Sequence, residues 1–216
     1  LVLAVVTGAA ILVLAPLMDR SNAATVADEH PAYLLDDLVQ ARLWQPTTEP
    51  DGRSSCVFSG ALTVRMLGHG LYKCRGPQDD LPRDMSAAVN VRLLTPGACA
   101  AVWFRFGQNR GYQLRICRSS IYLGTHKSKA VNVFRTFPLD SPIEVGGPAV
   151  RIGLSAVRDT LEVTRDGSVL GTATLSDPEI TGSRLLLGLY TDSDPPPSGP
   201  FSVAFDHIEV RDPGQR

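Results

Sequence analysis

Short runs of alternating apolar and polar residues recur from about residue 56 to the end of the chain. In such a run every second side chain lies on the same face of a β-strand, so each run predicts a strand with one buried face. Turn-forming residues separate the runs, and Asp166-Gly167 fits a two-residue hairpin turn. The pattern therefore predicts an all-β sandwich of two antiparallel sheets, with strands at 61–66, 70–74, 87–94, 99–106, 111–117, 120–125, 130–136, 149–157, 160–165, 168–175, 184–190 and 201–210.

The sequence of one predicted hairpin determines how its two strands pair. Residues 99–106 and 111–117 alternate like strands around the turn-forming sequence Gly-Gln-Asn-Arg. A turn centred near Gln108 places Cys99 opposite Cys117, and opposed residues of antiparallel strands lie about 4.5–5.5 Å apart, within disulfide reach. A slip of one residue would break the apolar alternation of both strands. The register assigns to the core face Ala100, Val102, Phe104, Tyr112, Leu114 and Ile116, and to the other face Cys99, Ala101, Trp103, Arg105, Gln113, Arg115 and Cys117.

The four cysteines indicate an exported domain. Pairing Cys99 with Cys117 leaves Cys56 to pair with Cys74, and each bridge would close a loop of about 18 residues, worth about 3 kcal/mol of stability. Disulfides persist in oxidising compartments outside the cytoplasm. The cysteines form no C-x-x-C pair and the histidines are scattered, so we expect no zinc site.

An uncharged apolar segment, residues 1–18, precedes the β region. As a helix it would be about 27 Å long, and a bilayer core is about 30 Å thick, so the segment predicts a membrane-spanning helix. The alternative is the apolar region of a signal peptide, with Ser21-Asn22-Ala23 as its cleavage pattern. The acidic flank that follows is typical of the external side of a membrane. We expect a stalk at 19–32, the β-sandwich at 33–211 and a tail at 212–216.

Both interpretations of the apolar segment place the β-sandwich outside the cytoplasm. A retained segment predicts a single-pass protein of the cell membrane, whereas a cleaved segment predicts a secreted protein. Because the chain begins with Leu1 rather than Met, we also expect it to be a fragment or a trimmed form.

Charge and composition exclude one class of partner. The net charge is −1, and the basic residues are spread singly along the chain, so we expect no binding to nucleic acid. Hydrophobic residues make up 44% of the chain, which is enough for a sizeable core. The expected partners are the membrane, through the N-terminal segment, and a ligand of the external domain.

Several motifs occur in the order and spacing of a known fold family. They are Phe104-Arg105, Tyr112 to Arg115, Asp166-Gly167, Gly188-Leu189-Tyr190 and Phe205-Asp206 to Val210. With these motifs residues 85–211 resemble the concanavalin A-like, laminin G-like jelly rolls, especially the bacterial branch of 3-keto-disaccharide hydrolase-like domains. The resemblance implies a jelly-roll sandwich. It also implies the outer domain of an actinobacterial membrane protein, such as a receptor-type serine/threonine kinase with one membrane span before the sandwich.

The sequence lacks the catalytic motifs expected for this fold. Laminarinase-type glycosidases contain E-x-D-x-E on one strand, which puts three carboxylates on one face. Here the acids of Asp159/Glu162 and Asp206/Glu209 are three residues apart, which places them on opposite faces of a strand. No G-x-S-x-G nucleophile elbow occurs, although a Ser-His-Asp triad built from distant residues stays open. The sequence therefore favours a module without catalytic activity.

The non-core face of the hairpin predicts a binding surface for a sugar. Aromatic rings suit the apolar C–H faces of a sugar, and planar polar side chains suit its hydroxyl groups. The strand that follows the hairpin adds a tyrosine and a histidine to the same face. In the alternative interpretation, Trp103 covers the Cys99–Cys117 bridge and packs under a loop. The candidate ligand-binding residues are Trp103, Arg105, Gln113, Arg115, Tyr122 and His126.

Several aspartates suggest a structural calcium ion, which often ties chain ends together in related jelly rolls. Asp206 lies in the last predicted strand, and Asp192 and Asp194 lie in the proline-rich loop before it. Asp36 and Asp37 could supply further oxygen ligands. The alternative interpretation is that these residues are solvated loop acids or turn caps. No organic cofactor is expected.

These features together predict a membrane-anchored, extracytoplasmic ligand-binding or sensor module for a carbohydrate or a cell-envelope glycan. One alternative is a carbohydrate-active hydrolase of the same fold. The other is a structural envelope domain that contacts another protein. A shallow aromatic groove would favour the binding module, a deep cleft with an acid pair would favour the hydrolase, and a flat apolar patch would favour the structural domain.

Overall fold

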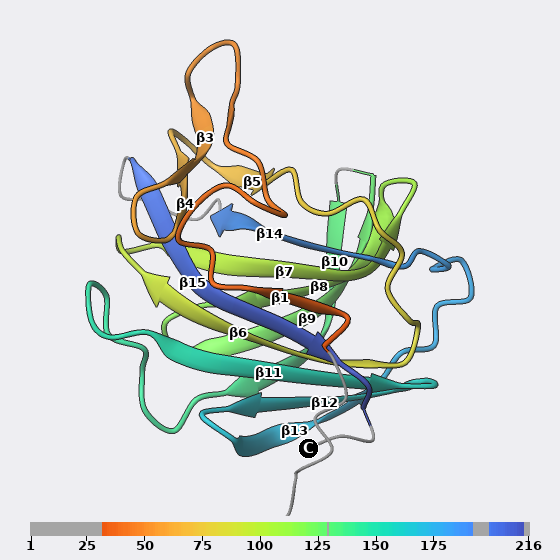
Figure 1. The fold of residues 1–216 in the computed structure, drawn as a ribbon. Coiled ribbons are helices and arrows are strands. Elements are labelled where there is room, and N and C mark those ends of the chain that lie inside the picture. Colours follow the sequence, from red (N-terminus) through yellow and green to blue (C-terminus); the bar gives the residue numbers. More distant parts are fainter. Residues whose placement is uncertain (1–31, 129, 192–198, 214–216) are drawn as a thin grey trace, which may run out of the picture. The chain divides into compact units, whose positions relative to one another are not determined.

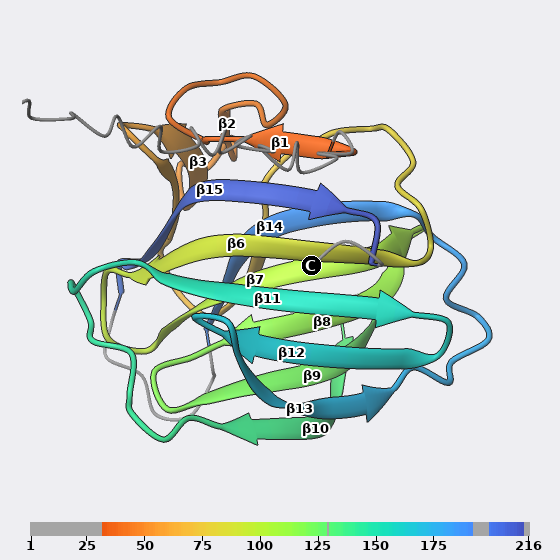
Figure 2. The ribbon, with the colours of Figure 1, turned by 60° about the horizontal axis from the view of Figure 1, so that its bottom comes forward.

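The computed structural model describes residues 32–128, 130–191 and 199–213. In these residues the chain forms two antiparallel β-sheets packed face to face, without a helix, and Figures 1 and 2 show the two layers. The predicted two-sheet sandwich is confirmed. The apolar helix expected at 1–18 lies outside the described residues. Among the described residues, no helix has the length and hydrophobicity that a membrane crossing requires.

One sheet has nine strands in the order β13-β12-β11-β6-β15-β4-β3-β2, and β1 pairs with the end of β15. The last strand of the chain, β15, therefore lies inside this sheet, between β6 and β4. The nine strands are β1 (Leu34–Asp36), β2 (Thr47–Thr48), β3 (Ser54–Phe58), β4 (Leu62–Met66), β6 (Met85–Leu93), β11 (Val150–Val157), β12 (Thr160–Arg165), β13 (Ser168–Thr174) and β15 (Phe201–Arg211).

The other sheet has six strands in the order β10-β9-β8-β7-β14-β5. Its strands run behind those of the nine-stranded sheet in the view of Figure 2. They are β5 (Gly70–Lys73), β7 (Ala98–Gly107), β8 (Arg110–Ile116), β9 (Ser120–Lys127), β10 (Ala130–Pro138) and β14 (Arg184–Thr191).

Apolar side chains from the inner faces of both sheets form the core. Buried and half-buried positions alternate along the whole of β6, as the sequence pattern predicts. Phe104, Leu114 and Phe205 are fully buried in this core. Each fully buried Leu, Val or Phe side chain contributes about 1.5–3 kcal/mol to folding, so the core is the main source of stability.

Every strand predicted from the alternation is present, within a few residues of its predicted ends. The three strands that the pattern misses are β1, β2 and β3, which have 3, 2 and 5 residues. β1 and β2 contain too few residues for an alternation to be recognised, and β3, with the sequence SSCVF, does not alternate. The turn at Asp166-Gly167 is also confirmed, because both residues have positive φ angles, 49° and 83°, as a type I′ hairpin turn requires.

The hairpin of β7 and β8 has the predicted register, with Trp103 opposite Gln113 and Phe104 opposite Tyr112. Both predicted disulfides are present. Cys99 and Cys117 join the two strands of this hairpin, with their Cα atoms 4.4 Å apart. The second bridge joins Cys56 in β3 to Cys74 after β5, with Cα atoms 5.7 Å apart, and so links the two sheets. Two disulfides indicate a domain that folds outside the cytoplasm.

Candidate functional site

The structure brings five of the six predicted ligand-binding residues together on the outer face of the six-stranded sheet, the face turned away from the core. Gln113 lies opposite Trp103 on the neighbouring strand, and Arg115 lies opposite Tyr122. His126 joins the group because its Nδ1 accepts a hydrogen bond of 3.3 Å from Nε1 of Trp103. Strand alternation and register account for this cluster, as predicted.

Arg105 is the exception, and the prediction that it shares this face is wrong. The pairing of β7 with β8 shifts between Phe104 and Gly107, and Arg105 has a positive φ of 47° at this β-bulge. The extra residue moves Phe106 onto the outer face beside Trp103. Arg105 instead donates a hydrogen bond of 3.0 Å to the carbonyl of Arg83, and only 1% of it is exposed.

The centre of the outer face is closed by packing. Trp103 is fully buried and forms a second apolar cluster with Ala101 and Phe106, to which Leu71 and Leu186 add partly buried contacts. This arrangement agrees with the alternative interpretation that Trp103 has a packing role. A sugar contact by Trp103 stays a prediction, and it would require these covering side chains to move.

His126 is neutral at physiological pH. Burial, and to a smaller extent the nearby positive charge of Lys73, lower its pKa to about 4 against the opposing effect of the Ser128 backbone. Because Nδ1 accepts the hydrogen bond from Trp103, the single proton of the ring resides on Nε2. Nε2 makes no hydrogen bond of normal geometry in the described part of the chain. His126 is fully buried, and the backbone of Ser128 lies near enough to its ring to affect its pKa.

Two cations lie on the same face and stack on aromatic rings. Nζ of Lys73 is 4.6 Å from the ring centre of Phe106. The guanidinium carbon of Arg115 is 4.1 Å from the ring centre of Tyr190 and 5.4 Å from that of Tyr122. Within the described residues, neither cation has a carboxylate partner. Cation–π contacts of this kind contribute about 0.5–2 kcal/mol each and hold the charges in place.

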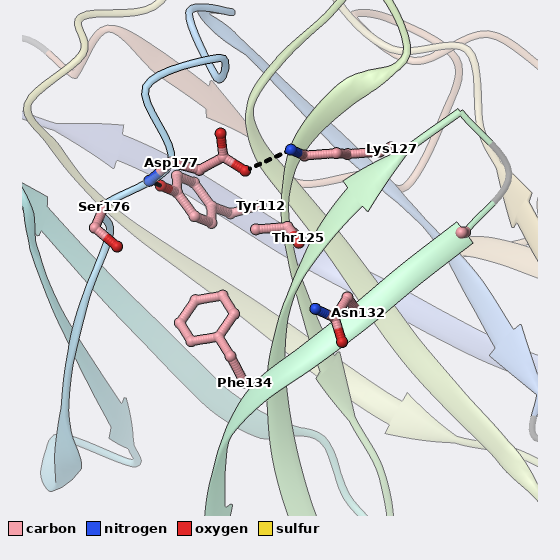
Figure 3. A pocket seen from close by; sticks show the side chains of 8 residues that line it. Tyr112, Thr125, Lys127, Asn132, Phe134, Ser176 and Asp177 are labelled. Atoms are coloured by element: carbon pink, nitrogen blue, oxygen red, sulfur yellow. Dashed lines mark hydrogen bonds and ion pairs between the residues drawn. The ribbon is translucent and has the colours of Figure 1, made fainter.

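A separate, open pocket lies at one end of the sandwich, between the six-stranded sheet and the segment after β13. Its volume is about 470 Å³, within the usual range of small-molecule sites. Figure 3 shows the ring of Phe134, the amide of Asn132 and the hydroxyl of Ser176 around this cavity. The pocket is lined by Tyr112, Thr125, Lys127, Ala130, Asn132, Phe134, Ser176 and Asp177.

Phe134 provides the exposed aromatic surface of the pocket. It is the extra residue of a β-bulge in β10, where the pairing with β9 shifts between Val133 and Arg135. Its ring makes an edge contact with Tyr112, with ring centres 6.3 Å apart, yet 44% of the residue remains exposed. An exposed ring fixed on a strand is suited to stacking against a flat apolar ligand surface.

An ion pair closes the opposite side of the pocket. Nζ of Lys127 lies 3.0 Å from the Asp177 carboxylate and 3.0 Å from that of Glu179 (Figure 3 shows the Asp177 pair). The hydrogen bond from Lys127 lowers the pKa of Asp177, and the bonds to Glu179 and Asp177 raise the pKa of Lys127. The backbone amide of Asp177 also donates a 3.0 Å hydrogen bond to the hydroxyl oxygen of Tyr112. The wall therefore holds its polar groups in fixed positions.

The sequence did not predict this pocket. The sequence assigns Tyr112 to the core face, and that assignment is correct, because Tyr112 is buried in the main core cluster although it also lines the pocket. Asn132 and Phe134 were read only as part of a strand. Their neighbours in the pocket, Ser176 and Asp177, belong to a segment that is distant in sequence. The one local signal is the polar Asn132 two residues before Phe134 on an edge strand.

Two of the predicted calcium ligands have partners within the protein, and the calcium site stays a prediction. The carboxylate of Asp206 faces the guanidinium of Arg92 at 3.5 Å. Both carboxylate oxygens of Asp36 accept hydrogen bonds from backbone amides of the turn that follows it, so Asp36 acts as a turn cap. No group of three or more candidate metal ligands occurs in the described part of the chain. Asp192 and Asp194 lie outside the described residues.

Comparisons with known proteins show the fold. No protein-family model matches the chain, and no curated protein matches it in sequence. Solved structures that match include a Bacillus licheniformis β-glucanase, with a TM-score of 0.58 and 9% identity over 82% of this chain and 97% of that one. A galectin-like protein from Bacillus subtilis has a TM-score of 0.59 and 9% identity over 85% of this chain and 96% of that one. A native glycosidic hydrolase has a TM-score of 0.60 and 12% identity over 85% and 97%. These similarities show a concanavalin A-like jelly roll.

Proposed function

We propose that the β-sandwich is an extracytoplasmic glycan-binding module without catalytic activity, and that the pocket in Figure 3 is its sugar site. The observation that supports this most strongly is the pairing, in one open cavity, of an exposed ring at Phe134 with an amide at Asn132. A sugar ring has an apolar C–H face and an edge of hydroxyl groups, and these two side chains match the two surfaces.

Each side of the pocket has a distinct role in this proposal. Phe134 stacks on the C–H face of the sugar. The amide of Asn132 donates to one hydroxyl and accepts from another, and the hydroxyls of Thr125 and Ser176 provide further bonds. Asp177 accepts a hydroxyl hydrogen while Lys127 holds its carboxylate in position. Because strands support most of these groups, little ordering entropy is lost on binding.

Proteins of the same fold give this proposal indirect support. One matching structure is a β-glucanase, and another is a Bacteroides ovatus GH16 protein in complex with a G4G4G3G product. The first protein is a glucanase and the second holds a glucan product, but at 9% and 10% identity the similarity extends only to the fold.

Three pockets of the described residues are each lined by two carboxylates, and two of these pairs are Asp80 with Glu179 and Asp140 with Asp166. The third pair is poorly arranged for glycoside hydrolysis. Glu162 and Glu209 line a shallow pocket on the outer face of the nine-stranded sheet. Glu209 lies in β15, which pairs with β6, and β6 pairs with β11. β11 in turn pairs with β12, which contains Glu162. The backbones of the two residues are therefore three strand spacings apart, about 14 Å. The two carboxyl groups of glycosidases lie about 5–9.5 Å apart. The Glu209 carboxylate is also bound by Arg151 and Arg211.

Binding measurements with a matched control test the sugar site. A panel of neutral gluco-, manno- and galacto-oligosaccharides is screened on an array, and the best ligand is titrated by calorimetry. Phe134→Ala should weaken binding about ten-fold or more, about 1.4 kcal/mol, because the stacking surface is lost. Val169→Ala is the control, because Val169 is 58% exposed on β13, away from this pocket.

Two outcomes would contradict the sugar site. In the first, no neutral oligosaccharide of the panel binds. In the second, Phe134→Ala binds as tightly as the unaltered protein. Hydrolysis of the bound oligosaccharide, followed by product analysis, would instead contradict the non-catalytic part of the proposal.

Membrane anchoring and a sensor role belong to the same proposal. They are supported by the apolar sequence of residues 1–18 and by the resemblance to outer domains of actinobacterial receptor kinases. Fractionation of cells that express the chain with and without residues 1–18 tests the anchor. The full chain should sediment with membranes, and its recovery in the culture medium would contradict anchoring.

A further inference from the structure

The outer face of the six-stranded sheet has an unusual charge composition. Outward positions on its strands include the cations Lys73 and Arg115, and the described outward positions include no aspartate or glutamate. These positions include Leu71 and Lys73 in β5, Arg184, Leu186, Gly188 and Tyr190 in β14, Cys99, Ala101, Trp103 and Phe106 in β7, Gln113 and Arg115 in β8, Tyr122, Gly124 and His126 in β9, and Val131, Val133 and Thr136 in β10. We call this surface the basic face.

The two cations lie in one row across the sheet. Lys73 pairs with Gly188, Gly188 pairs with Ala101, and Ala101 pairs with Arg115. Their backbones are therefore three strand spacings apart, about 14 Å, and only two small residues separate them. The Trp103 ring fills the space above Gly188, since a Cβ at Gly188 would lie 2.9 Å from Trp103 Cζ3. The row thus has a flat aromatic base between two long basic side chains.

No negative charge among the described residues compensates for the burial of these two cations. Burial lowers the pKa of Lys73, and no carboxylate acts in the opposite direction. Arg115 is mostly buried between two tyrosine rings, and its guanidinium makes no hydrogen bond within the described residues. An anion placed here would stabilise the charged form of Lys73.

A buried amide beside Arg115 also lacks a partner. Gln113 is fully buried on the same face, two residues before Arg115 on β8, and neither its Oε1 nor its Nε2 has a hydrogen bond in the described part of the chain. A buried polar group without a bond costs about 1–3 kcal/mol. A ligand that displaces the side chains covering this amide would satisfy its hydrogen-bonding groups.

We propose that the basic face binds the carboxylate of an acidic sugar. Arg115 is suited to a planar carboxylate because its guanidinium offers two parallel N–H groups, and Lys73 adds a second positive charge. The rings of Tyr122 and Tyr190 flank the guanidinium and provide apolar surface for the sugar ring. The inference rests on the proposed glycan-binding function for its ligand class, but its residues are separate from those of the pocket in Figure 3.

Titration with acidic sugars tests this proposal. Trimers of galacturonate and of glucuronate, and N-acetylneuraminate, are titrated by calorimetry against the unaltered protein, together with the methyl ester of the galacturonate trimer and with sodium sulfate. At least one acidic sugar should bind ten-fold or more tightly than the ester, and more weakly at 0.5 M than at 0.05 M salt, because salt screens charged pairs.

Variants assign the binding to the basic face. Arg115→Met should weaken binding of the acidic sugar ten-fold or more, and Arg115→Lys should restore only part of it. Lys73→Met, which leaves Arg115 in place, should weaken binding three-fold or more even if Arg115→Met fails to fold. Arg65→Met is the matched control, because Arg65 is an exposed arginine on β4 of the other sheet.

Several results would overturn the proposal. They are the absence of binding by all three acidic sugars, equal binding of the trimer and its ester, and unchanged binding in the Lys73→Met variant. Sulfate that binds as tightly as the sugars would overturn the assignment to a carboxylate. Phe134→Ala should leave acidic-sugar binding unchanged, so loss of binding in Phe134→Ala alone would place the ligand in the pocket of Figure 3 and refute the basic face as its site.

Discussion

The two disulfides offer a controlled measurement of what a cross-link contributes to this fold. Each bridge joins cysteines that are 18 residues apart. In the chain-entropy model the stabilisation depends only on this loop length, so each bridge should contribute about 3 kcal/mol at 25 °C. The bridges differ in their surroundings, because Cys99–Cys117 joins two strands that are already paired, whereas Cys56–Cys74 links the two sheets.

The assay is equilibrium unfolding in urea of three proteins: the unaltered chain, the Cys56→Ala/Cys74→Ala variant and the Cys99→Ala/Cys117→Ala variant. With a urea slope of about 2 kcal/mol per molar, each variant should lose about 1.5 M in its unfolding midpoint. Both variants should show the same loss within about 0.5 M. A much larger loss for the bridge between the sheets would refute the reasoning, because it would show that contacts in the folded state, and not loop length, decide the contribution.

Gly188 and His126, on the same face of the six-stranded sheet, should both affect the stability of the protein. Gly188→Ala should destabilise the protein by about 1–3 kcal/mol, measured by urea unfolding, because the new Cβ would lie 2.0 Å from the carbonyl oxygen of Tyr72. His126 should make stability depend on pH. Its pKa is about 4 when folded and about 6.5 when unfolded, so the unfolded chain binds the proton first as the pH falls. His126 therefore costs no stability above pH 6.5 and about 3 kcal/mol by pH 4. His126→Gln should remove this part of the pH dependence, and an unchanged profile would contradict the neutral assignment.

The sequence predicted most of the sandwich because its strands are long enough for alternation to show. β6 alternates over nine residues, and β11 over eight. The hairpin register was also predictable, since the apolar pattern of both strands and the position of Cys99 and Cys117 agree on one pairing. Where several local signals indicate the same geometry, a single sequence is sufficient to predict how two strands pair.

The bulges at Arg105 and Phe134 were not predictable from alternation. A bulge adds one residue to a strand, and in β7 it does so at an arginine with positive φ, a conformation that the residue type does not favour. Each bulge changes which side chain reaches the site: Phe106 replaces Arg105 on the basic face, and Phe134 reaches the pocket. The pocket also required the packing of Ser176 and Asp177 against β10, which no local pattern contains.

The position of β15 has a consequence for how the domain is made. This strand is synthesised after the other described strands of the domain, yet it lies between β6 and β4 and also pairs with β1 near the start of the domain. Until residues 201–211 have emerged, β4 and β6 have no partner between them, and their edges can pair with other chains. The sheet therefore cannot close before residue 211 has emerged, and its completion depends on contacts between distant segments, which form slowly. A chain that crosses a membrane before folding is compatible with this order of assembly, and a truncation that removes β15 would leave an aggregation-prone polypeptide.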